Sequence, residues 1–348
     1  MLVALLTAAC GGGSSTGEGA RPVGAPGDAG GRIALNGAGA TFPYPVYSKW
    51  FDEYHKRHPD SQINYQSIGS GGGIRQLLAG TVDFGASDGP MTDEQLAQAK
   101  IPVLHFPTVL GAVVPTYNIP GVSVAIKFTP QALAGIYLGT ITKWNDRALA
   151  MVNPDLKFPA NDIVVVHRSD GSGTSFVFTD YLSKVSPQWA KSVGRNTAVK
   201  WPVGLGGKGN EGVAGLVQQM PNSIGYVELI YAVQNKLPYG SVQNTTGAFV
   251  RADLAGVSAA AAASPMPADF RVSITNASGA NAYPIASFTW LLIPERIPDA
   301  AKQQALVGFL RWMLVDGQQM VEALSYAPLP ADVVKAEDQA IARITVGR

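Results

Sequence analysis

The segment IVVVHRSDGSGTS, residues 163–175, joins an apolar run to a loop of glycine, serine and threonine. The apolar run predicts a buried strand, and the amphipathic residues 176–185 that follow predict a helix. A loop that opens a helix offers free backbone N–H groups and hydroxyls to an anion. Arg168 adds a planar guanidinium whose donors match the oxygens of phosphate or carboxylate. Alone, the segment also fits an ordinary turn with an N-cap, so its interpretation depends on other loops.

Two further loops have the same chemistry. Residues 33–35 and 63–68 predict strands, and they lead into the loops GAGATFP at 37–43 and GSGGG at 69–73. In open α/β sheets, ligands bind outside the carboxyl ends of the strands. We therefore predict that three small, donor-rich segments contact one tetrahedral oxyanion. They are residues 40–42, 69–71 and 172–174.

The order of strand, loop and helix along the chain predicts a mainly parallel sheet with helices on both faces. Residues 82–86 and 103–117 are further predicted strands, and 305–324 predict one long amphipathic helix. At 348 residues the chain has room for two domains, and a second unit is expected to begin near Asn118. Residues 243–282, rich in Ala, Ser and Gly, are interpreted as a variable excursion with a helix through 259–263.

The composition excludes several classes of protein. Hydrophobic residues make up 46% of the chain and charged residues 15%, which is typical of a globular protein. The formal net charge of +1, without a run of Lys or Arg, argues against a nucleic-acid-binding surface. Cys10 is the one cysteine, so no intramolecular disulfide can form.

The first residues look like the end of an export signal. Residues 1–9 are apolar but too short to span a bilayer. LLTAAC, residues 5–10, resembles the lipobox of bacterial lipoproteins, in which the cysteine carries the lipid, although Thr7 stands where Leu is most common. Residues 11–31 are rich in Gly, Ser, Ala and Pro and predict a flexible tether. The alternative is a disordered tail in which Cys10 has no role.

Common motifs for phosphate, nucleophiles and metals do not fit. Residues 37–42 begin like a dinucleotide-binding fingerprint, but Phe42 fills the third glycine position. GGKG at 206–209 lacks the Ser or Thr that follows the lysine of a P-loop. Neither Ser70 nor Ser172 has the two flanking glycines of a nucleophile elbow. The four histidines are scattered, without the carboxylates or cysteines of a metal site, so we expect no metal and no cofactor.

Several long segments resemble the periplasmic phosphate-binding proteins of high-affinity phosphate ABC importers. They are GAGATFPYPVYSKW (37–50), INYQSIGSGGGIRQLLAGTVDFGASDGPMT (63–92), VVVHRSDGSGTSFVFTDYL (164–182) and WPVGLGGKGNEGVAGLVQQMPNSIGYVE (201–228). The resemblance resumes at YPI (283–285) and YAPLP (326–330), whereas residues 243–282 do not obviously match.

The resemblance implies a two-domain α/β fold, the type II-like periplasmic-binding-protein fold. In that fold each domain is a mainly parallel sheet flanked by helices, and the ligand lies in the interdomain cleft. The expected boundaries place residues 1–31 in the signal, anchor and tether, residues 32–115 plus 289–348 in domain I, and residues 116–288 in domain II.

The resemblance also implies a set of ligand residues. The residues of the family that bind phosphate fall on Thr41, Phe42 (through its backbone N–H), Ser70, Asp88, Arg168, Ser172, Gly173 and Thr174. The acidic residue that pairs with the arginine and holds it in place falls on Asp170. Gly71 stands where the family often has serine, which we do not expect to affect binding.

Asp88 carries the sharpest chemical inference. A carboxylate that faces a dianion in a dry site would repel it, unless the ligand brings a proton to donate. Hydrogen phosphate has such a proton and sulfate has none. We therefore expect Asp88 to accept a hydrogen bond from phosphate and to discriminate against sulfate. The alternative for Asp88 is a structural role as a helix N-cap or turn residue.

The resemblance implies a receptor rather than an enzyme. It would bind inorganic phosphate outside the cytoplasm, as a monomer held to the membrane through Cys10, and deliver the anion to the permease of an ABC importer. A general oxyanion receptor or scavenger and a phosphate-ester hydrolase stay open as alternatives. A hydrolase would need an activated nucleophile or a metal cluster, and the sequence shows no histidine partner for Ser70 or Ser172. GLGGKGN (204–210) is expected to shape the rim of the cleft or the surface that faces the permease, and Lys208 is not assigned to the ligand.

Overall fold

The computed structural model describes residues 32–122 and 124–347. Cys10 and the predicted tether lie outside the described residues, so the lipid anchor stays a prediction. Among the helices that are described, none combines the length and the apolar character needed to cross a membrane.

The described strands form one large sheet and two small ones. The large sheet has eight strands in the order β2-β1-β3-β11-β4-β8-β6-β7. The strands are β1 (Ile33–Gly39), β2 (Ser61–Ser67), β3 (Phe84–Ser87), β4 (Val103–Asn118), β5 (Lys127–Phe128), β6 (Val164–Arg168), β7 (Leu205–Gly207), β8 (Ser223–Glu228), β9 (Ser241–Gln243), β10 (Phe249–Arg251), β11 (Ala286–Pro294), β12 (Arg296–Ile297) and β13 (Thr345–Val346).

Helices follow most of these strands, and several begin at a side-chain cap. The helices are α1 (Tyr44–Arg57), α2 (Ser70–Ala79), α3 (Asp93–Leu96), α4 (Pro130–Leu138), α5 (Arg147–Ala150), α6 (Gly173–Val185), α7 (Pro187–Ser192), α8 (Gly209–Gln219), α9 (Leu229–Gln234), α10 (Leu254–Ala262), α11 (Ala300–Val315) and α12 (Ala331–Ile341), with 3-10 turns η1 (Gly317–Met320) and η2 (Glu322–Leu324). Thr92 and Gln95 form a capping box at α3, and the Thr129 side chain caps α4. These caps supply acceptors to N–H groups that have no partner inside the helix.

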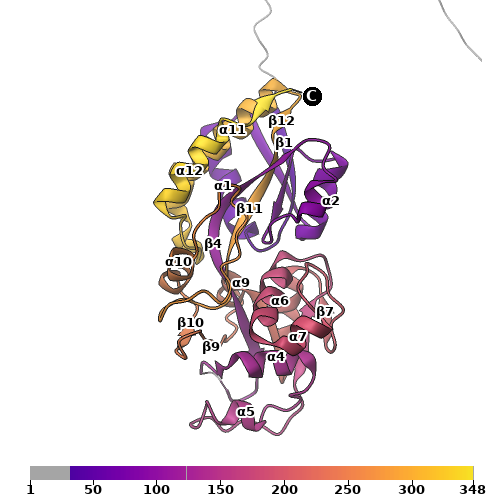
Figure 1. Cartoon of the computed structure of the whole chain (residues 1–348), viewed down its shortest axis with the longest axis vertical. Coiled ribbons are helices and arrows are strands. Elements are labelled where there is room, and N and C mark those ends of the chain that lie inside the picture. The colour runs from indigo at the N-terminus through magenta and orange to yellow at the C-terminus, as the bar shows by residue number, and fades with distance from the viewer. Residues whose placement is uncertain (1–31, 123, 348) are drawn as a thin grey trace, which may run out of the picture. The chain divides into compact units, whose positions relative to one another are not determined.

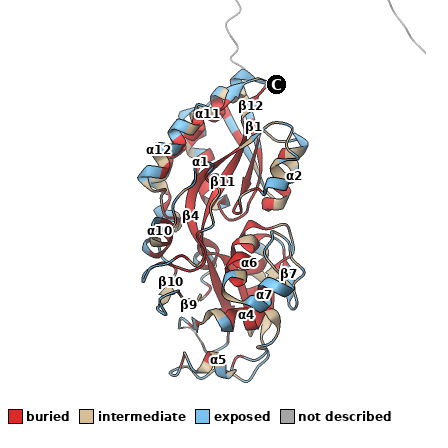
Figure 2. Ribbon diagram, viewed as in Figure 1, coloured by how far each residue is buried: buried red, intermediate tan, exposed pale blue. Residues whose placement is uncertain are grey.

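Two long strands run through the middle of the large sheet. β4 is paired with β11 from Val103 to Ala112 and with β8 from Val113 to Asn118. Both strands are buried along almost their whole length, as the red ribbons of Figure 2 show. A strand buried on both faces reads as a continuous apolar run, which is how the sequence of β4 reads. The predicted domain boundaries fall inside β4 and β11, and they stay predictions.

The sheet is mixed rather than parallel throughout. The outer strands of each half, β2-β1-β3 and β8-β6-β7, are parallel, whereas β11 and β4 run antiparallel to their neighbours. Helices cover both faces: in Figure 1, α11 and α12 lie on one side of the strands β1 and β11, and α2 lies on the other. Because β11 lies between β3 and β4, residues 286–294 lie beside residues that are about 200 positions earlier in the sequence.

Three helices differ from the sequence-based expectation. α2 begins at Ser70, inside the predicted glycine loop, and α6 begins at Gly173, three residues earlier than predicted. The predicted helix over 305–324 is wrong in its second part, because α11 ends at Val315 and two 3-10 turns follow. The chain leaves the α-helix where the indole N–H of Trp50 donates to the carbonyl oxygen of Gly317 at 2.8 Å.

Candidate anion site

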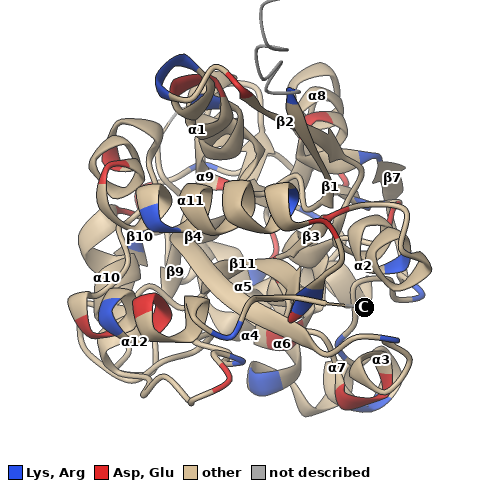
Figure 3. Ribbon diagram, turned by 90° about the horizontal axis from the view of Figure 1, so that it is seen from above, with Lys and Arg blue, Asp and Glu red and all other residues tan. Residues whose placement is uncertain are grey.

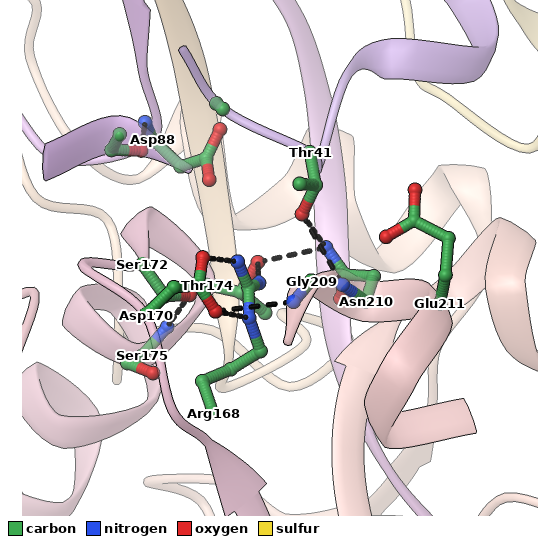
Figure 4. Close-up of polar contacts among 12 residues, drawn as sticks. Thr41, Asp88, Arg168, Asp170, Ser172, Thr174, Ser175, Gly209, Asn210 and Glu211 are labelled. Carbon is green, nitrogen blue, oxygen red and sulfur yellow. Dashed lines mark hydrogen bonds and ion pairs between the residues drawn. The ribbon is translucent and has the colours of Figure 1, made fainter. Parts of the chain in front are cut away.

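The three predicted loops lie at the carboxyl ends of parallel strands and meet in the middle of the sheet. Thr41 follows β1, Ser70 opens α2 after β2, and residues 172–174 open α6 after β6. The second and third loops touch directly, because the N–H of Gly71 donates to the carbonyl oxygen of Gly171 at 2.8 Å. In Figure 4, Thr41 and Asp88, which follow β1 and β3, face Arg168 and Thr174, which lie at the end of β6 and the start of α6.

Asp88 and Ser70 approach the start of α6 closely. A Cβ atom on Gly173 would collide with the Ser70 hydroxyl oxygen and with Oδ2 of Asp88, so a larger residue here would displace these side chains. The Ser70 hydroxyl oxygen also accepts a hydrogen bond from the backbone N–H of Asp88 at 3.3 Å. The structure thus brings together one carboxylate, one serine hydroxyl and one helix N-terminus.

The N-terminus of α6 is arranged as a donor site. The Ser172 hydroxyl oxygen accepts from the N–H of Ser175 at 3.0 Å and caps the helix, which leaves its own hydrogen free to donate. The backbone N–H groups of Gly173 and Thr174 form no hydrogen bond to another described residue. Unpaired N–H groups at the positive end of a helix favour a negative ligand.

Arg168 is held in place by Asp170. The Arg168 side chain, 1% exposed, donates from Nε to Oδ1 of Asp170 at 2.8 Å and from Nη2 to Oδ2 at 2.5 Å. Its remaining nitrogen, Nη1, donates to the hydroxyl oxygen of Thr174 at 3.2 Å. Burial acts to raise the pKa of Asp170, but the hydrogen bonds and charge of Arg168 outweigh it, so the pKa lies below its usual value. The ion pair is therefore fully charged near neutral pH.

Asp88 has one satisfied and one unsatisfied oxygen. Oδ1 accepts from the Thr289 hydroxyl at 2.8 Å, whereas Oδ2 has no hydrogen-bond partner among the described residues. Burial raises the pKa of Asp88 to about 7, although the Thr289 hydrogen bond and the positive charge of Arg168 oppose the shift. A buried carboxylate oxygen without a donor calls for a ligand that brings one.

Phe42 lies in the loop that follows β1. Its ring is fully buried, and its carbonyl oxygen accepts from the Tyr326 hydroxyl at 2.6 Å. The N–H of Phe42 donates to no other described residue. The side chain therefore anchors the loop after β1 in the core while its N–H stays available.

Comparison with known proteins identifies the family. A family model described as a PBP superfamily domain matches residues 23–316. The phosphate-binding protein PstS of Xylella fastidiosa is 46% identical over 306 residues, which cover 87% of this chain and 83% of that protein. PstS of Haemophilus influenzae is 46% identical over 304 residues, covering 86% of this chain and 90% of that protein. The chain belongs to the PstS family of the PBP superfamily.

Solved structures agree with this assignment at the level of the fold. A high-affinity periplasmic phosphate-binding protein (PfluDING) with bound phosphate superimposes with a TM-score of 0.72, at 21% identity, over 88% of this chain and 93% of that one. A phosphate-binding protein from Stenotrophomonas maltophilia gives a TM-score of 0.67, at 19% identity, with coverage of 88% and 93%. The predicted two-domain periplasmic-binding-protein fold is confirmed.

Three residues that the sequence analysis did not assign to the site contact residues that it did assign. Thr289 lies in β11, where the register with β4 shifts between Thr289 and Trp290, and it bonds to Asp88 across 201 positions of sequence. Gly209 donates its N–H to Asp170 at 3.1 Å, and Asn210 donates to Thr41 and Thr174. The glycine-rich composition of residues 204–210 was the available signal for the last two, whereas Thr289 gave none.

The described residues outside this site were compared with two other kinds of site, a basic surface for nucleic acid and a cluster of metal ligands. Lys and Arg are interspersed with Asp and Glu over the ribbon in Figure 3. No group of three or more His, Cys, Asp or Glu side chains that could hold a metal ion occurs within residues 32–122 and 124–347. The described histidines make structural contacts; the buried His105, for example, accepts from the N–H of Met91 at 3.1 Å.

Proposed function

We propose that this protein binds inorganic phosphate at the anion site and delivers it to the permease of a phosphate ABC importer. The observation that carries the proposal is the pairing of convergent donors with one unsatisfied buried acceptor, Oδ2 of Asp88. Relatives at 46% identity that are named phosphate-binding proteins support the same ligand. Hydrogen phosphate matches such a site, because it accepts from many donors and donates once.

The ligand residues that we propose share one property, which is that each can direct a donor or the single acceptor at a central anion. They are Thr41, Phe42, Ser70, Asp88, Arg168, Ser172, Gly173 and Thr174. The guanidinium supplies positive charge, the helix N–H groups and hydroxyls supply neutral donors, and Asp88 accepts the proton of the ligand. Sulfate would leave Asp88 facing a dianion with no hydrogen between them.

We propose that the protein acts without catalysis. The hydroxyl oxygen of Ser172 accepts from Ser175, and that of Ser70 accepts from Asp88. Among the described residues, no histidine forms a hydrogen bond with either serine. A serine without a base is a poor nucleophile. Turnover of an aryl phosphate that is abolished by Ser172→Ala would contradict this part of the proposal.

Calorimetric titration of the anion-free protein at pH 8.5, where most of the Asp88 carboxyl is ionised in the folded protein, tests the proposed function. We expect tight one-to-one binding of phosphate and no heat with sulfate, because only phosphate can donate to Asp88. Equal binding of the two anions would instead indicate a general oxyanion receptor. Absence of binding for both would leave the fold without the proposed ligand.

We also propose that the protein works outside the cytoplasm as a monomer and is lipidated at Cys10, on the basis of the LLTAAC segment. A single acyl chain holds a protein only weakly, so a stable anchor needs the several chains of a bacterial lipoprotein. Mass spectrometry of the protein from a membrane fraction should show an acylated N-terminal cysteine. An intact Met1 or an unmodified Cys10 would contradict the anchor.

A further inference from the structure

Asn210 occupies the point where the two halves of the site meet. Its side chain is fully buried at the start of α8. Nδ2 donates to the hydroxyl oxygen of Thr41 at 2.8 Å and to that of Thr174 at 3.1 Å, and the backbone N–H donates to Thr41 at 3.3 Å. One residue therefore contacts two hydroxyls that come from opposite halves of the sheet (Figure 4).

The orientation of the Asn210 amide is fixed by its other end. Oδ1 accepts from the backbone N–H of Glu228 at 3.0 Å. A backbone N–H can only donate, so exchanging the amide oxygen and nitrogen would set two donors against each other. The NH₂ group must therefore face Thr41 and Thr174, and its two hydrogens match its two acceptors.

This contact decides what the two threonine hydroxyls can do. A hydroxyl has one hydrogen and two lone pairs. The oxygen of Thr41 accepts from the backbone and side-chain nitrogens of Asn210. The oxygen of Thr174 accepts from Asn210 and from Nη1 of Arg168 at 3.2 Å. With both lone pairs engaged, each hydroxyl keeps only its hydrogen to offer to the anion.

We propose that Asn210 is a positioning residue that holds the Thr41 and Thr174 hydroxyls as hydrogen-bond donors to the bound anion. The inference rests on the proposed function, since it needs an anion between the two threonines. Hydroxyls that are oriented in advance need not rotate when the anion binds, which favours tight binding. The same contacts connect the Thr41 loop to the start of α6.

The substitutions Asn210→Asp and Asn210→Ala test the proposal. Asp has the same shape but presents an acceptor, so both threonine hydrogens turn toward it and a negative charge lies near the ligand. At pH 8 we expect N210A to weaken phosphate binding by about tenfold or more, and N210D by about 1,000-fold. At pH 5 the protonated Asp can again donate, so the ratio of the N210D to the N210A dissociation constant should fall.

A matched control separates positioning from stability. Asn153 is also buried, and its amide donates to the carbonyl oxygens of Lys127 and Leu149 away from the site. N153D should lower the melting temperature of the anion-free protein but leave phosphate affinity unchanged. All variants are titrated with phosphate by calorimetry and melted without it.

The outcomes are distinguishable. If the unmodified protein does not bind phosphate, the proposed function fails. If it binds and both Asn210 variants bind as tightly, the inference about Asn210 is overturned. A ratio between the N210D and N210A dissociation constants that is the same at pH 8 and pH 5 would also overturn it, because the proposal requires the protonated carboxyl to donate again. Should N210D not fold, a loss of less than about threefold in N210A decides against the proposal.

Discussion

Replacing Asp88 with asparagine should reduce the preference for phosphate over sulfate by at least about 100-fold. Oδ2 of Asp88 lacks a partner among the described residues and lies against Gly173, at the helix N-terminus that we propose to bind the anion. In D88N an amide NH₂ group can take the place of this oxygen and donate, so a fully deprotonated oxyanion is no longer repelled. Phosphate affinity should fall because its proton loses an acceptor, and sulfate binding should appear.

Calorimetric titration of D88N and of the unmodified protein with both anions at pH 8.5, where most of Asp88 is ionised, measures this effect. Asp83→Asn is the matched control, because Asp83 is a carboxylate of the same half of the protein that bonds to Lys302, outside the site. D83N should keep the discrimination of the unmodified protein. If D88N rejects sulfate as strongly as the unmodified protein does, selectivity does not depend on the charge of Asp88.

The same substitution should make the anion-free protein more stable at alkaline pH. The carboxyl of Asp88 ionises near pH 3.9 in the unfolded chain, whereas burial raises its pKa to about 7 in the folded protein. Below about pH 4 both states hold the proton and Asp88 has no effect. Above pH 7 the folded state contains a buried charge, at a cost of up to about 4 kcal/mol. The melting temperature of D88N should therefore exceed that of the unmodified protein at pH 8 and match it at pH 4.

The sequence predicts the local parts of this site because they are encoded locally. A strand followed by glycine, serine and threonine and then by an amphipathic run gives β6, the loop and α6, with Ser172 as the N-cap. Arg168 and Asp170 are two positions apart, so their pairing needs no knowledge of the fold. The carboxyl ends of parallel strands lie at one edge of a sheet, which is why three separate loops could be assigned to one anion.

Long-range contacts account for what the sequence did not predict. Asn210 meets Thr41 across 169 positions, and Thr289 meets Asp88 across 201. No pattern near Thr289 marks it, since its role follows from the pairing of β11 between β3 and β4. The early end of α11 has the same cause, because Trp50 and the carbonyl of Gly317 are far apart in sequence.

Replacing Arg168 with lysine should lower phosphate affinity by about 100-fold or more. The guanidinium donates from Nε and Nη2 to Asp170 and from Nη1 to Thr174. One rigid group therefore bonds to both residues at once. A lysine ammonium is a single compact charge that cannot make this two-point contact with the carboxylate and still reach the anion site. Titration with phosphate measures the loss, and Lys184→Arg, on α6 but bonded to Asp180 instead, serves as the reverse control.

Arg168→Met separates two roles of the arginine, which are to neutralise Asp170 and to attract the anion. It leaves Asp170, whose side chain is 13% exposed, with a buried charge and mainly the N–H of Gly209 for a partner. Breaking a buried ion pair from one side typically destabilises a protein by about 3–5 kcal/mol. The double variant R168M/D170N removes the stranded charge, so it should regain much of the lost stability, and a double-mutant cycle of melting temperatures measures the coupling.

Across these variants, phosphate affinity should not recover together with the melting temperature. If the arginine contributes its charge to the anion, R168M/D170N should stay at least about 100-fold weaker than the unmodified protein although it folds nearly as well. Recovery of both properties together would mean that Arg168 only neutralises Asp170, and that the anion is bound by neutral donors. The N-terminus of α6 and the hydroxyls of Thr41, Ser70 and Thr174 would then have to bind a dianion facing Asp88 without a compensating cation. Burial of uncompensated charge makes that arrangement the weaker one, so we expect the two properties to separate.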